Sequence, residues 1–395
     1  MAKTLDWQRK EYKLTCISPV HVGTGDILKY YEYIYVQKEG QKRVYFLEQT
    51  RWAQFLLAHN LLDEYAAEVM KGKKNALYPW LQKKGISLTA ALLQQICRSY
   101  ADVYMDEGEQ KTTLNDISCQ MKDGHGLPYI PGSSIKGAIR TAILHHLIKK
   151  EPAQYQDIWQ QVKANIRSGK WTKYQSQDLE RRALAKLPQE TKYKNDALQS
   201  VMRGIQVSDA VLCHPNPQTV ILQKWDASKV RGSNNVTPHS LPIFRECIPA
   251  GTAFRFSIKL DKNMTSYIGL SSLSELWQWV REYTQAGLSL QQPFFGSLYK
   301  AEFEEAQTAD ICLGGGTGLL SKTVFYTLAG KEKEGQRTLA TYLDNHFTTW
   351  NRQARQREGV HQHQRKDEIT PRTLKLAQAG STKWLLGLAQ VAEVK

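Results

Sequence analysis

The sequence lacks a cysteine pairing pattern and any long apolar run. Its six cysteines stand far apart, at positions 16, 97, 119, 213, 247 and 312, and none forms a C-x-x-C pair. This spacing argues against a zinc ribbon and against a disulfide framework, so we expect reduced and mostly buried thiols. No apolar stretch approaches the roughly 18–20 residues of a membrane helix. The polar segment Met1 to Lys13 lacks the apolar core of a secretory signal, so we expect a soluble, cytoplasmic protein with no membrane partner.

Motifs for metals, cofactors and hydrolytic catalysis are also missing. His361 and His363 form the single H-x-H, in a stretch without cysteines that could complete a metal site, so we expect no metal and no cofactor. The patterns H-E-x-x-H and G-x-S-x-G do not occur. One catalytic alternative stays open, in which His21 acts as general acid or base in RNA cleavage with Asp26 or Glu32 nearby. Nothing in the spacing forces these residues together, and a single histidine at a strand end is usually structural.

Acidic residues are few relative to basic ones. The chain has 38 Asp and Glu against 53 Lys and Arg, a formal net charge of +15. Such an excess favours a polyanionic partner, most commonly nucleic acid. Aromatic residues stand beside cations in the segments 170–174 and 192–194, which suits stacking on single-stranded RNA, although each ring could equally well serve packing. The basic stretch 352–372 could bind RNA or a protein partner.

The pattern of apolar residues predicts an α+β fold. Strand blocks alternate with separate helical regions and show no regular βαβ repeat. Both halves contain segments of the β-α-β-β-α-β type, as in ferredoxin-like domains. We therefore predict an N-terminal domain, 1–225, with helical insertions at about 49–100 and 150–200, and a C-terminal domain, 226–395. Predicted strands cover 12–20, 30–36, 43–47, 113–121, 204–211, 219–225, 243–248 and 252–260, and predicted helices begin near 131 and cover 271–290 and 336–357.

Two segments could bind phosphate. The first is the helix that follows Pro131, with Ser133 or Ser134 as its expected N-cap and with Lys136 and Arg140 on one side. The N-terminus of a helix attracts anions, but the segment is equally compatible with a capped amphipathic helix that has a solvated basic edge.

The second is a glycine-rich loop. Gly314, Gly315, Gly316, Thr317 and Gly318 are followed by Lys322, in a spacing that matches neither a P-loop nor a dinucleotide loop. Small residues let backbone N–H groups approach an anion, which favours a sugar–phosphate backbone over a nucleotide. A purely structural turn is the alternative. A shorter glycine turn, with Gly23 and Gly25, follows His21.

The order of these motifs resembles the RAMP proteins of CRISPR systems, and among them the type III-A Csm subunit that caps the 3′ end of the guide RNA. The resemblance rests on separated segments that span nearly the whole chain: 18–25, 130–137, 207–209, 246–252, 313–323 and 371–375. It implies two RRM-like (ferredoxin-like) domains that hold crRNA through its backbone. It also implies docking against the repeated backbone RAMP subunit and the small helical subunit. The glycine loop departs from the pattern, because it has no aromatic residue among its glycines.

By match to these motifs, the residues expected to contact RNA are His21, Gly23, Gly25, Ser133, Ser134, Lys136, Arg140, Gly314, Gly315, Gly316, Thr317, Gly318 and Lys322. The backbone subunits of such complexes cleave target RNA with a loop aspartate, for which Asp26 and Glu32 are the nearest candidates here. The capping subunit is not expected to cleave. We therefore predict a non-catalytic, crRNA-binding subunit. The alternatives are a metal-independent guide-processing endoribonuclease and a pure protein–protein adaptor.

Overall fold

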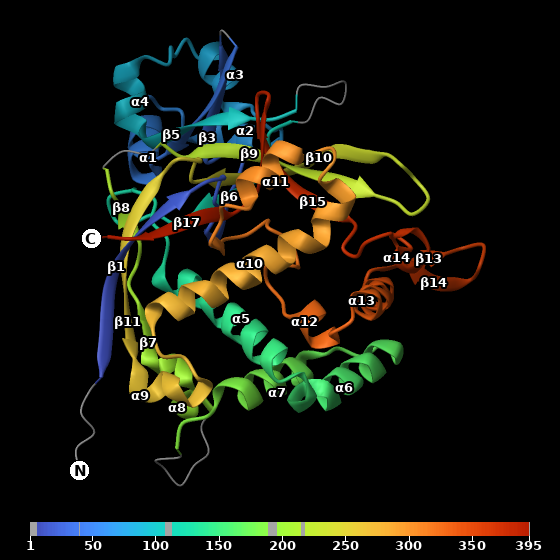
Figure 1. Cartoon of the computed structure of the whole chain (residues 1–395). Coiled ribbons are helices and arrows are strands. Elements are labelled where there is room, and N and C mark those ends of the chain that lie inside the picture. Colours follow the sequence, from blue (N-terminus) through green and yellow to red (C-terminus); the bar gives the residue numbers. More distant parts are fainter. Residues whose placement is uncertain (1–5, 39, 107–112, 189–195, 215–217, 395) are drawn as a thin grey trace.

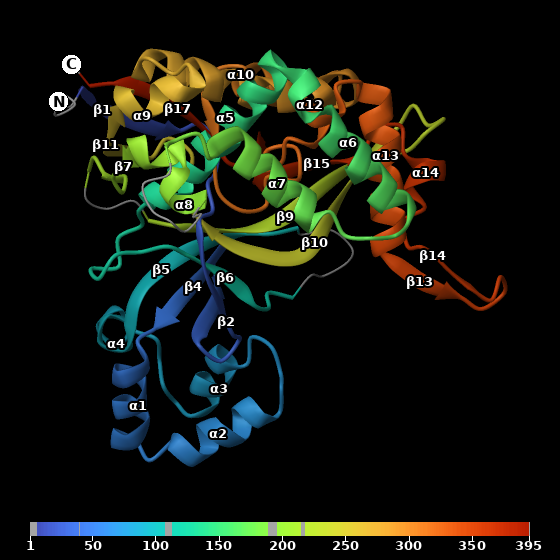
Figure 2. The ribbon, with the colours of Figure 1, turned by 90° about the horizontal axis from the view of Figure 1, so that it is seen from below.

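An antiparallel β-sheet, a mixed β-sheet, a separate two-stranded hairpin and the helices packed on the sheets form the molecule (Figures 1 and 2). The computed structural model describes residues 6–38, 40–106, 113–188, 196–214 and 218–394. The strands are β1 (Trp7–Cys16), β2 (Gly23–Leu28), β3 (Tyr33–Lys38), β4 (Gln41–Leu47), β5 (Cys97–Tyr104), β6 (Ile117–Gln120), β7 (Ile205–Val207), β8 (Val211–Leu212), β9 (Val220–Lys229), β10 (Val236–Cys247), β11 (Ala253–Asp261), β12 (Ile311–Cys312), β13 (Thr348–Asn351), β14 (Gln356–Gly359), β15 (Thr373–Ala379), β16 (Thr382–Leu385) and β17 (Leu388–Glu393).

The helices fall into an early group, a middle group and a late group. The α-helices are α1 (Gln49–Ala58), α2 (Leu62–Met70), α3 (Leu77–Lys83), α4 (Ala90–Ile96), α5 (Gly132–Lys150), α6 (Gln156–Arg167), α7 (Lys173–Leu184), α8 (Asp196–Gln199), α9 (Lys262–Thr265), α10 (Leu273–Phe295), α11 (Lys300–Ala306), α12 (Phe325–Ala329), α13 (Glu332–His346) and α14 (His363–Lys366). Short 3-10 helices are η1 (Pro152–Tyr155), η2 (Val201–Gly204) and η3 (Ser266–Ile268).

The first sheet has the order β12-β17-β1-β11-β7, with β8 also paired to β11. Alternation along β1 and β11 buries one side chain in two, including Leu14 and Phe254, which is the period of a strand with one covered face. Helices α5 and α10 cover that face, with Ile139 and Leu276 fully buried in the same core.

The second sheet has the order β2-β6-β10-β9-β5-β4-β3, and β15 joins it beside β9 and pairs with β16. Helices α1 to α4 pack at its β3–β4 end around Trp52 and Leu81. Figure 2 shows this sheet between the early helices and the layer that contains α5 and α10.

The predicted α+β class with helical insertions is confirmed, but several elements differ. The helix predicted for 336–357 ends at His346, and the hairpin β13–β14 follows it. The sequence Phe347-Thr348-Thr349-Trp350 is rich in β-branched and aromatic residues, and Asn351 begins a turn, so a hairpin is the better local solution. Gly23 and Gly25, expected in a turn over residues 21–26, lie in β2, and β5 begins at Cys97 inside the predicted helical insertion.

Strand pairing does not follow the predicted domain boundary at 225 and 226. That boundary falls inside β9, and β1 pairs with both β11 and β17 from the other half of the chain. The division into two domains stays a prediction.

The cysteines are free thiols, as expected. Cys16, Cys97 and Cys247 are buried, and burial raises the pKa of each to about 12. Among the described residues, the helices are all too short or too polar to cross a membrane.

Candidate functional site

The glycine-rich loop folds directly on the backbone of His21. The Gly315 N–H donates to the His21 carbonyl at 2.7 Å, and the Leu313 N–H donates to the Gly387 carbonyl at 2.7 Å. A Cβ on Gly314 would lie 2.2 Å from the His21 carbonyl oxygen, and Gly314 has φ +78°. Position 314 therefore requires glycine both for its backbone angle and for this close approach.

The loop is held in shape by side chains, while several of its amides stay available. The Ser321 hydroxyl donates to Thr317 Oγ1 at 2.8 Å, and the Tyr283 hydroxyl lies 3.0 Å from the carbonyl oxygens of Leu320 and Thr323. Within the described part of the chain, the N–H groups of residues 316, 317 and 318 have no hydrogen-bond partner. Successive free N–H groups in a glycine turn form an anion-binding concavity.

Cationic side chains surround these amides. The Arg245 guanidinium on β10 lies about 3.5 Å from where a Cβ on Gly316 would stand, and Lys375 on β15 lies next to Gly318. Lys322 is exposed just beyond the loop. Arg245 has no ion pair among the described residues, whereas the Lys375 ammonium lies 2.8 Å from the Asp226 carboxylate. Burial lowers the pKa of Lys375 despite this partner. An unpaired guanidinium beside free amides favours a phosphate group.

His21 contacts the glycine loop through its backbone, and its side chain is buried. Its Nδ1 lies 2.7 Å from the Glu246 carbonyl oxygen, which can only accept, so Nδ1 carries the proton. Burial lowers the pKa of His21 and favours the neutral ring. A Cβ on Gly23 would lie 2.9 Å from His21 Nε2, so Gly23 belongs to the same packing, whereas Gly25 has φ +95° and open space around it.

The geometry does not assemble the catalytic alternative at His21. The Glu32 carboxylate accepts from the Lys29 N–H at 2.7 Å, and the Asp26 N–H donates to Thr24 Oγ1 at 3.0 Å. Neither carboxylate is hydrogen-bonded to His21 among the described contacts. His21 is therefore placed as a support of the loop backbone, without a proton-transfer partner in this arrangement.

The start of α5 differs from the prediction. The N-cap position is Pro131 rather than Ser133 or Ser134, and Pro131 has no amide hydrogen and no side-chain acceptor. The acceptor comes from elsewhere, because the Asp209 carboxylate accepts from the Gly132 N–H at 2.7 Å. Proline fits the position before the first helical turn, where an N–H would stay unpaired. The Asp209 carboxylate thus occupies the N-terminus of α5, where the sequence suggested that a phosphate could bind.

Lys136 and Arg140 lie on a different flank of α5 from the glycine loop. Ala138 lines a pocket together with Thr317 and Leu320 of the loop. Two residues along a helix correspond to about 200° of rotation, so Lys136 and Arg140 project away from that pocket. They line a separate depression with Tyr174 of α7, where Arg140 forms an ion pair with Glu180. Burial lowers the pKa of Lys136.

Sequence reasoning missed Arg245, Asp209 and Asp226. Asp209 belongs to the matched segment Val207-Ser208-Asp209, but nothing in that segment indicates what its carboxylate contacts. Arg245 immediately precedes another matched segment, and its position on a central strand was the available signal. Asp226, which holds Lys375, lies in β9 and has no local signature.

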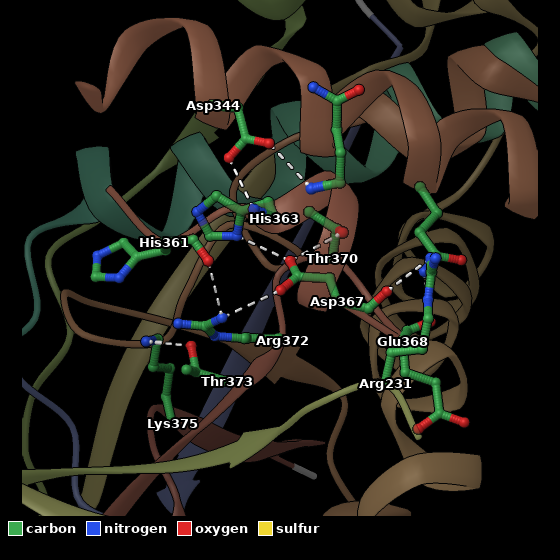
Figure 3. Close-up of polar contacts among 12 residues, drawn as sticks. Arg231, Asp344, His361, His363, Asp367, Glu368, Thr370, Arg372, Thr373 and Lys375 are labelled. Carbon is green, nitrogen blue, oxygen red and sulfur yellow. Dashed lines mark hydrogen bonds and ion pairs between the residues drawn. The ribbon is translucent and has the colours of Figure 1, made fainter. Parts of the chain in front are cut away.

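We term the hairpin β13–β14 the arm. The segment that leads into β15 connects the glycine loop with this arm. Figure 3 shows that Lys375 and Arg372 lie beside a cluster around the buried Asp367. The Asp367 carboxylate lies 2.8 Å from His363 Nδ1 and accepts from the Thr370 hydroxyl at 3.2 Å. Arg372 lies 3.5 Å from Asp367 and donates to the His361 carbonyl at 3.3 Å. The matched segment 371–375 therefore ties the glycine loop to the base of the arm.

Among the described residues, no group of three or more His, Cys, Asp or Glu side chains is placed to hold a metal ion. His361 and His363 have ring centroids 5.6 Å apart, and His363 is engaged with Asp367.

Comparison with known proteins gives a consistent picture. The model of the RAMP superfamily matches residues 13–320. The chain is 26% identical over 328 residues to "CRISPR system Cms protein Csm5" of Mycobacterium tuberculosis, covering 79% of this chain and 82% of that protein. The protein of the same name from Streptococcus thermophilus is 26% identical, with 81% of each chain covered.

Solved structures show the same fold. A chain of the cryo-EM structure of a Csm-crRNA-target RNA ternary complex in a type III-A CRISPR-Cas system superposes with a TM-score of 0.64 at 18% identity, covering 98% of this chain and 100% of that chain. The crystal structure of T. onnurineus Csm5 gives a TM-score of 0.54 at 18% identity, covering 80% and 92%. The resemblance expected from the motifs is confirmed.

Proposed function

The chain belongs to the RAMP superfamily, and we therefore propose that it is an RNA-binding subunit of a type III-A CRISPR effector complex. In this proposal it caps the 3′ end of the crRNA in a cytoplasmic ribonucleoprotein and does not cleave RNA. The observation that carries the proposal is the glycine loop, with three unpartnered amides beside Arg245, Lys375 and Lys322 among the described residues.

The chemistry of this loop suits a sugar–phosphate backbone. Backbone amides and a guanidinium recognise phosphate oxygens and carry no base information, so binding should depend little on sequence and strongly on salt. The similarity to a chain of a Csm-crRNA-target RNA complex and to Csm5 proteins supports crRNA as the ligand. The repeated backbone RAMP subunit and the small helical subunit are the proposed protein partners.

A placement experiment tests the capping role. Guide RNAs that carry one photoreactive nucleotide, at the 3′ or the 5′ end, are assembled with the full set of subunits and irradiated. Crosslinking of this chain at the 3′ end, lost on Arg245→Glu and kept on Lys73→Glu, supports capping. Lys73 is an exposed lysine near α3 and serves as the charge control. Crosslinking at the 5′ end alone contradicts the proposal.

The enzyme alternative has its own readout. Purified chain is incubated with repeat RNA without metal, and the products are resolved by length. We expect intact RNA. Cleavage that His21→Ala abolishes would establish the endoribonuclease instead.

A further inference from the structure

An exposed aromatic surface lies where the turn between α6 and α7 meets the end of α13. Neither segment is part of the glycine loop. Trp171, in the turn between α6 and α7, is 67% exposed, although its ring centroid lies 4.0 Å from that of His346 at the end of α13. Trp350, on β13 of the arm that follows α13, is 59% exposed. Tyr174, 77% exposed, extends the surface in the other direction.

The tip of the arm is a structured, cationic turn. The Asn351 side chain accepts from the Gln353 N–H at 2.9 Å and from the Ala354 N–H at 3.1 Å, and Arg355 has φ +51°. This fixed turn presents Arg352 and Arg355, both exposed. Figures 1 and 2 show the arm projecting from the body beside α13.

The two faces of the arm differ in charge. Trp350 pairs across the hairpin with Arg357, which places both side chains on one face. Glu358 belongs to the other face, where Asn351 donates to its carboxylate at 2.9 Å. One face thus carries an aromatic ring with a guanidinium, while the acidic group is engaged on the opposite side.

The base of the arm is fastened to the body. The Asp344 carboxylate on α13 accepts from the backbone N–H groups of His363 at 2.7 Å and Gln364 at 3.0 Å (Figure 3). A Cβ on Gly359 would lie 2.5 Å from Asp344 Oδ1, so glycine is needed for this contact. The aromatic surface is therefore held in place rather than carried on a loose loop.

The charge of this surface selects its partner. Within the ranges that the structure describes, no ion pair involves Lys170, Lys173, Arg352 or Arg355, and all four are exposed. The carboxylates of Asp344 and Glu358 on the arm side accept hydrogen bonds. Those of Asp178 and Glu180, which line the depression beside Tyr174, form ion pairs with arginines. Exposed rings interleaved with unpaired cations match the bases and phosphates of a single strand.

We propose that Trp171, Tyr174 and Trp350, with Lys170, Lys173, Arg352 and Arg355, form a second platform for single-stranded RNA, distinct from the glycine loop. Tyr174 also lines the depression that contains Lys136 and Arg140, so these two cations border the platform. The inference goes beyond the capping function, because a strand bound at the loop would gain a second contact if it is long enough to reach the arm.

The test compares two RNA lengths on the full chain. The probes are a short oligouridylate of about five nucleotides, matched to a single site, and one several times longer. We expect Trp171→Ala with Trp350→Ala to weaken binding of the longer probe at least tenfold and to leave the short probe unchanged. Replacement of both tryptophans by Phe should keep most of the affinity, since Phe still stacks.

Charge gives a second, independent readout. Arg352→Ala with Arg355→Ala should reduce the slope of log affinity against log salt by about 1.4 for the longer probe, at about 0.7 per phosphate contact. Tyr267→Ala, an exposed tyrosine in η3, is the control and should change neither probe. Thermal unfolding of each variant separates misfolding from lost contacts, and Trp350→Ala alone is informative if Trp171→Ala unfolds the chain.

The outcomes separate the two proposals. If neither the tryptophan nor the arginine substitutions change the affinity for the longer probe, the platform proposal is wrong. If the same variants instead fail to assemble with the other subunits, the surface binds a protein partner. Loss of short-probe binding on Arg245→Glu reports on the glycine loop alone.

Discussion

At the scale of single residues, the decisive feature is the contact between the glycine loop and His21. Gly314 combines φ +78° with an approach so close that an added Cβ would lie 2.2 Å from a carbonyl oxygen. A Cβ on Gly315 would lie 3.4 Å from the ring of His21, an ordinary contact, and Gly315 has no positive φ. Two adjacent glycines thus have different requirements.

Substitution of these glycines should separate their roles. Gly314→Ala is expected to lower the free energy of unfolding by more than about 1 kcal/mol, because both backbone angle and packing are violated. It should also abolish RNA binding at the loop. Gly315→Ala, the matched control, should cost clearly less. Equal denaturant midpoints for the two variants would contradict these separate roles.

A second residue-scale prediction concerns acid stability. His145 is buried against Thr327 and Tyr283, and burial lowers its pKa from 6.5 to about 4, with Lys149 and His146 adding to the effect and Glu282 opposing it. The unfolded chain binds this proton more readily, so the contribution of His145 to stability is complete above about pH 6.5 and is lost as the pH falls toward 4. The loss amounts to roughly 3 kcal/mol.

Denaturant titrations at pH 7 and pH 4.5 measure this contribution. The unfolding free energy of His145→Gln should fall less steeply between these pH values than that of the unaltered chain. His125→Gln, at an exposed position, should follow the unaltered chain. Parallel pH dependence in all three proteins would assign the acid sensitivity to other groups.

At the scale of elements, the start of α5 shows what local sequence cannot supply. The serines after Pro131 suggested a local cap, but the cap comes from Asp209, 77 positions away in sequence. We expect Asp209→Ala to lower the free energy of unfolding by about 1 kcal/mol, because the Gly132 N–H loses its acceptor. Asp209→Asn keeps an acceptor oxygen and should restore most of that loss. A larger effect from Ser133→Ala, measured in the same way, would argue for the local cap.

The base of the arm offers another element-scale prediction. Asp367 is 1% exposed and holds His363 and Thr370, so Asp367→Ala should lower the free energy of unfolding by about 3 kcal/mol. Asp157→Ala removes an exposed carboxylate paired with Arg182 and should lower the free energy of unfolding clearly less, because solvent screens an exposed ion pair. Similar melting temperatures for the two variants would show that the cluster in Figure 3 does not stabilise the arm.

Elements were predictable where one local signal dominated. The hairpin near residues 30–47, α5 and α10 follow from alternation or helical period. The predicted helix continued past His346 to residue 357, and this was wrong. Charged residues extend the helical pattern there, whereas the β-branched pair Thr348-Thr349 indicates a strand. β5 was missed because Cys97 follows α4 without a loop.

At the scale of the whole molecule, the sequence motifs predicted the family and the class of fold, but not the pairing of strands. β1 lies between β11 and β17, and that neighbourhood depends on contacts between residues far apart in the chain, which no local pattern carries. The same limit applies to the site. The glycine loop was found from its own residues, whereas Arg245 and Asp226 reach it from strands of the second sheet.

The separation of two cationic regions is also a property of the whole molecule. Lys136 and Arg140 lie on one flank of α5 and the glycine loop on the other. If guide RNA contacts both, Lys136→Glu with Arg140→Glu should weaken a long strand by at least tenfold and a short one little. RNA affinity that is unaffected at both lengths, measured by filter binding, would confine these two side chains to a structural or adaptor role.

The glycine loop is tested as an RNA site by a filter-binding titration of single-stranded guide RNA across salt concentration, with Arg245→Glu, Lys322→Glu and the control Lys73→Glu. We predict tight binding of intact RNA that falls steeply with salt, and lower affinity and a shallower slope in the first two variants. The control should match the unaltered chain. Binding that is indifferent to Arg245→Glu and Lys322→Glu would contradict the assignment of the glycine loop as an RNA site.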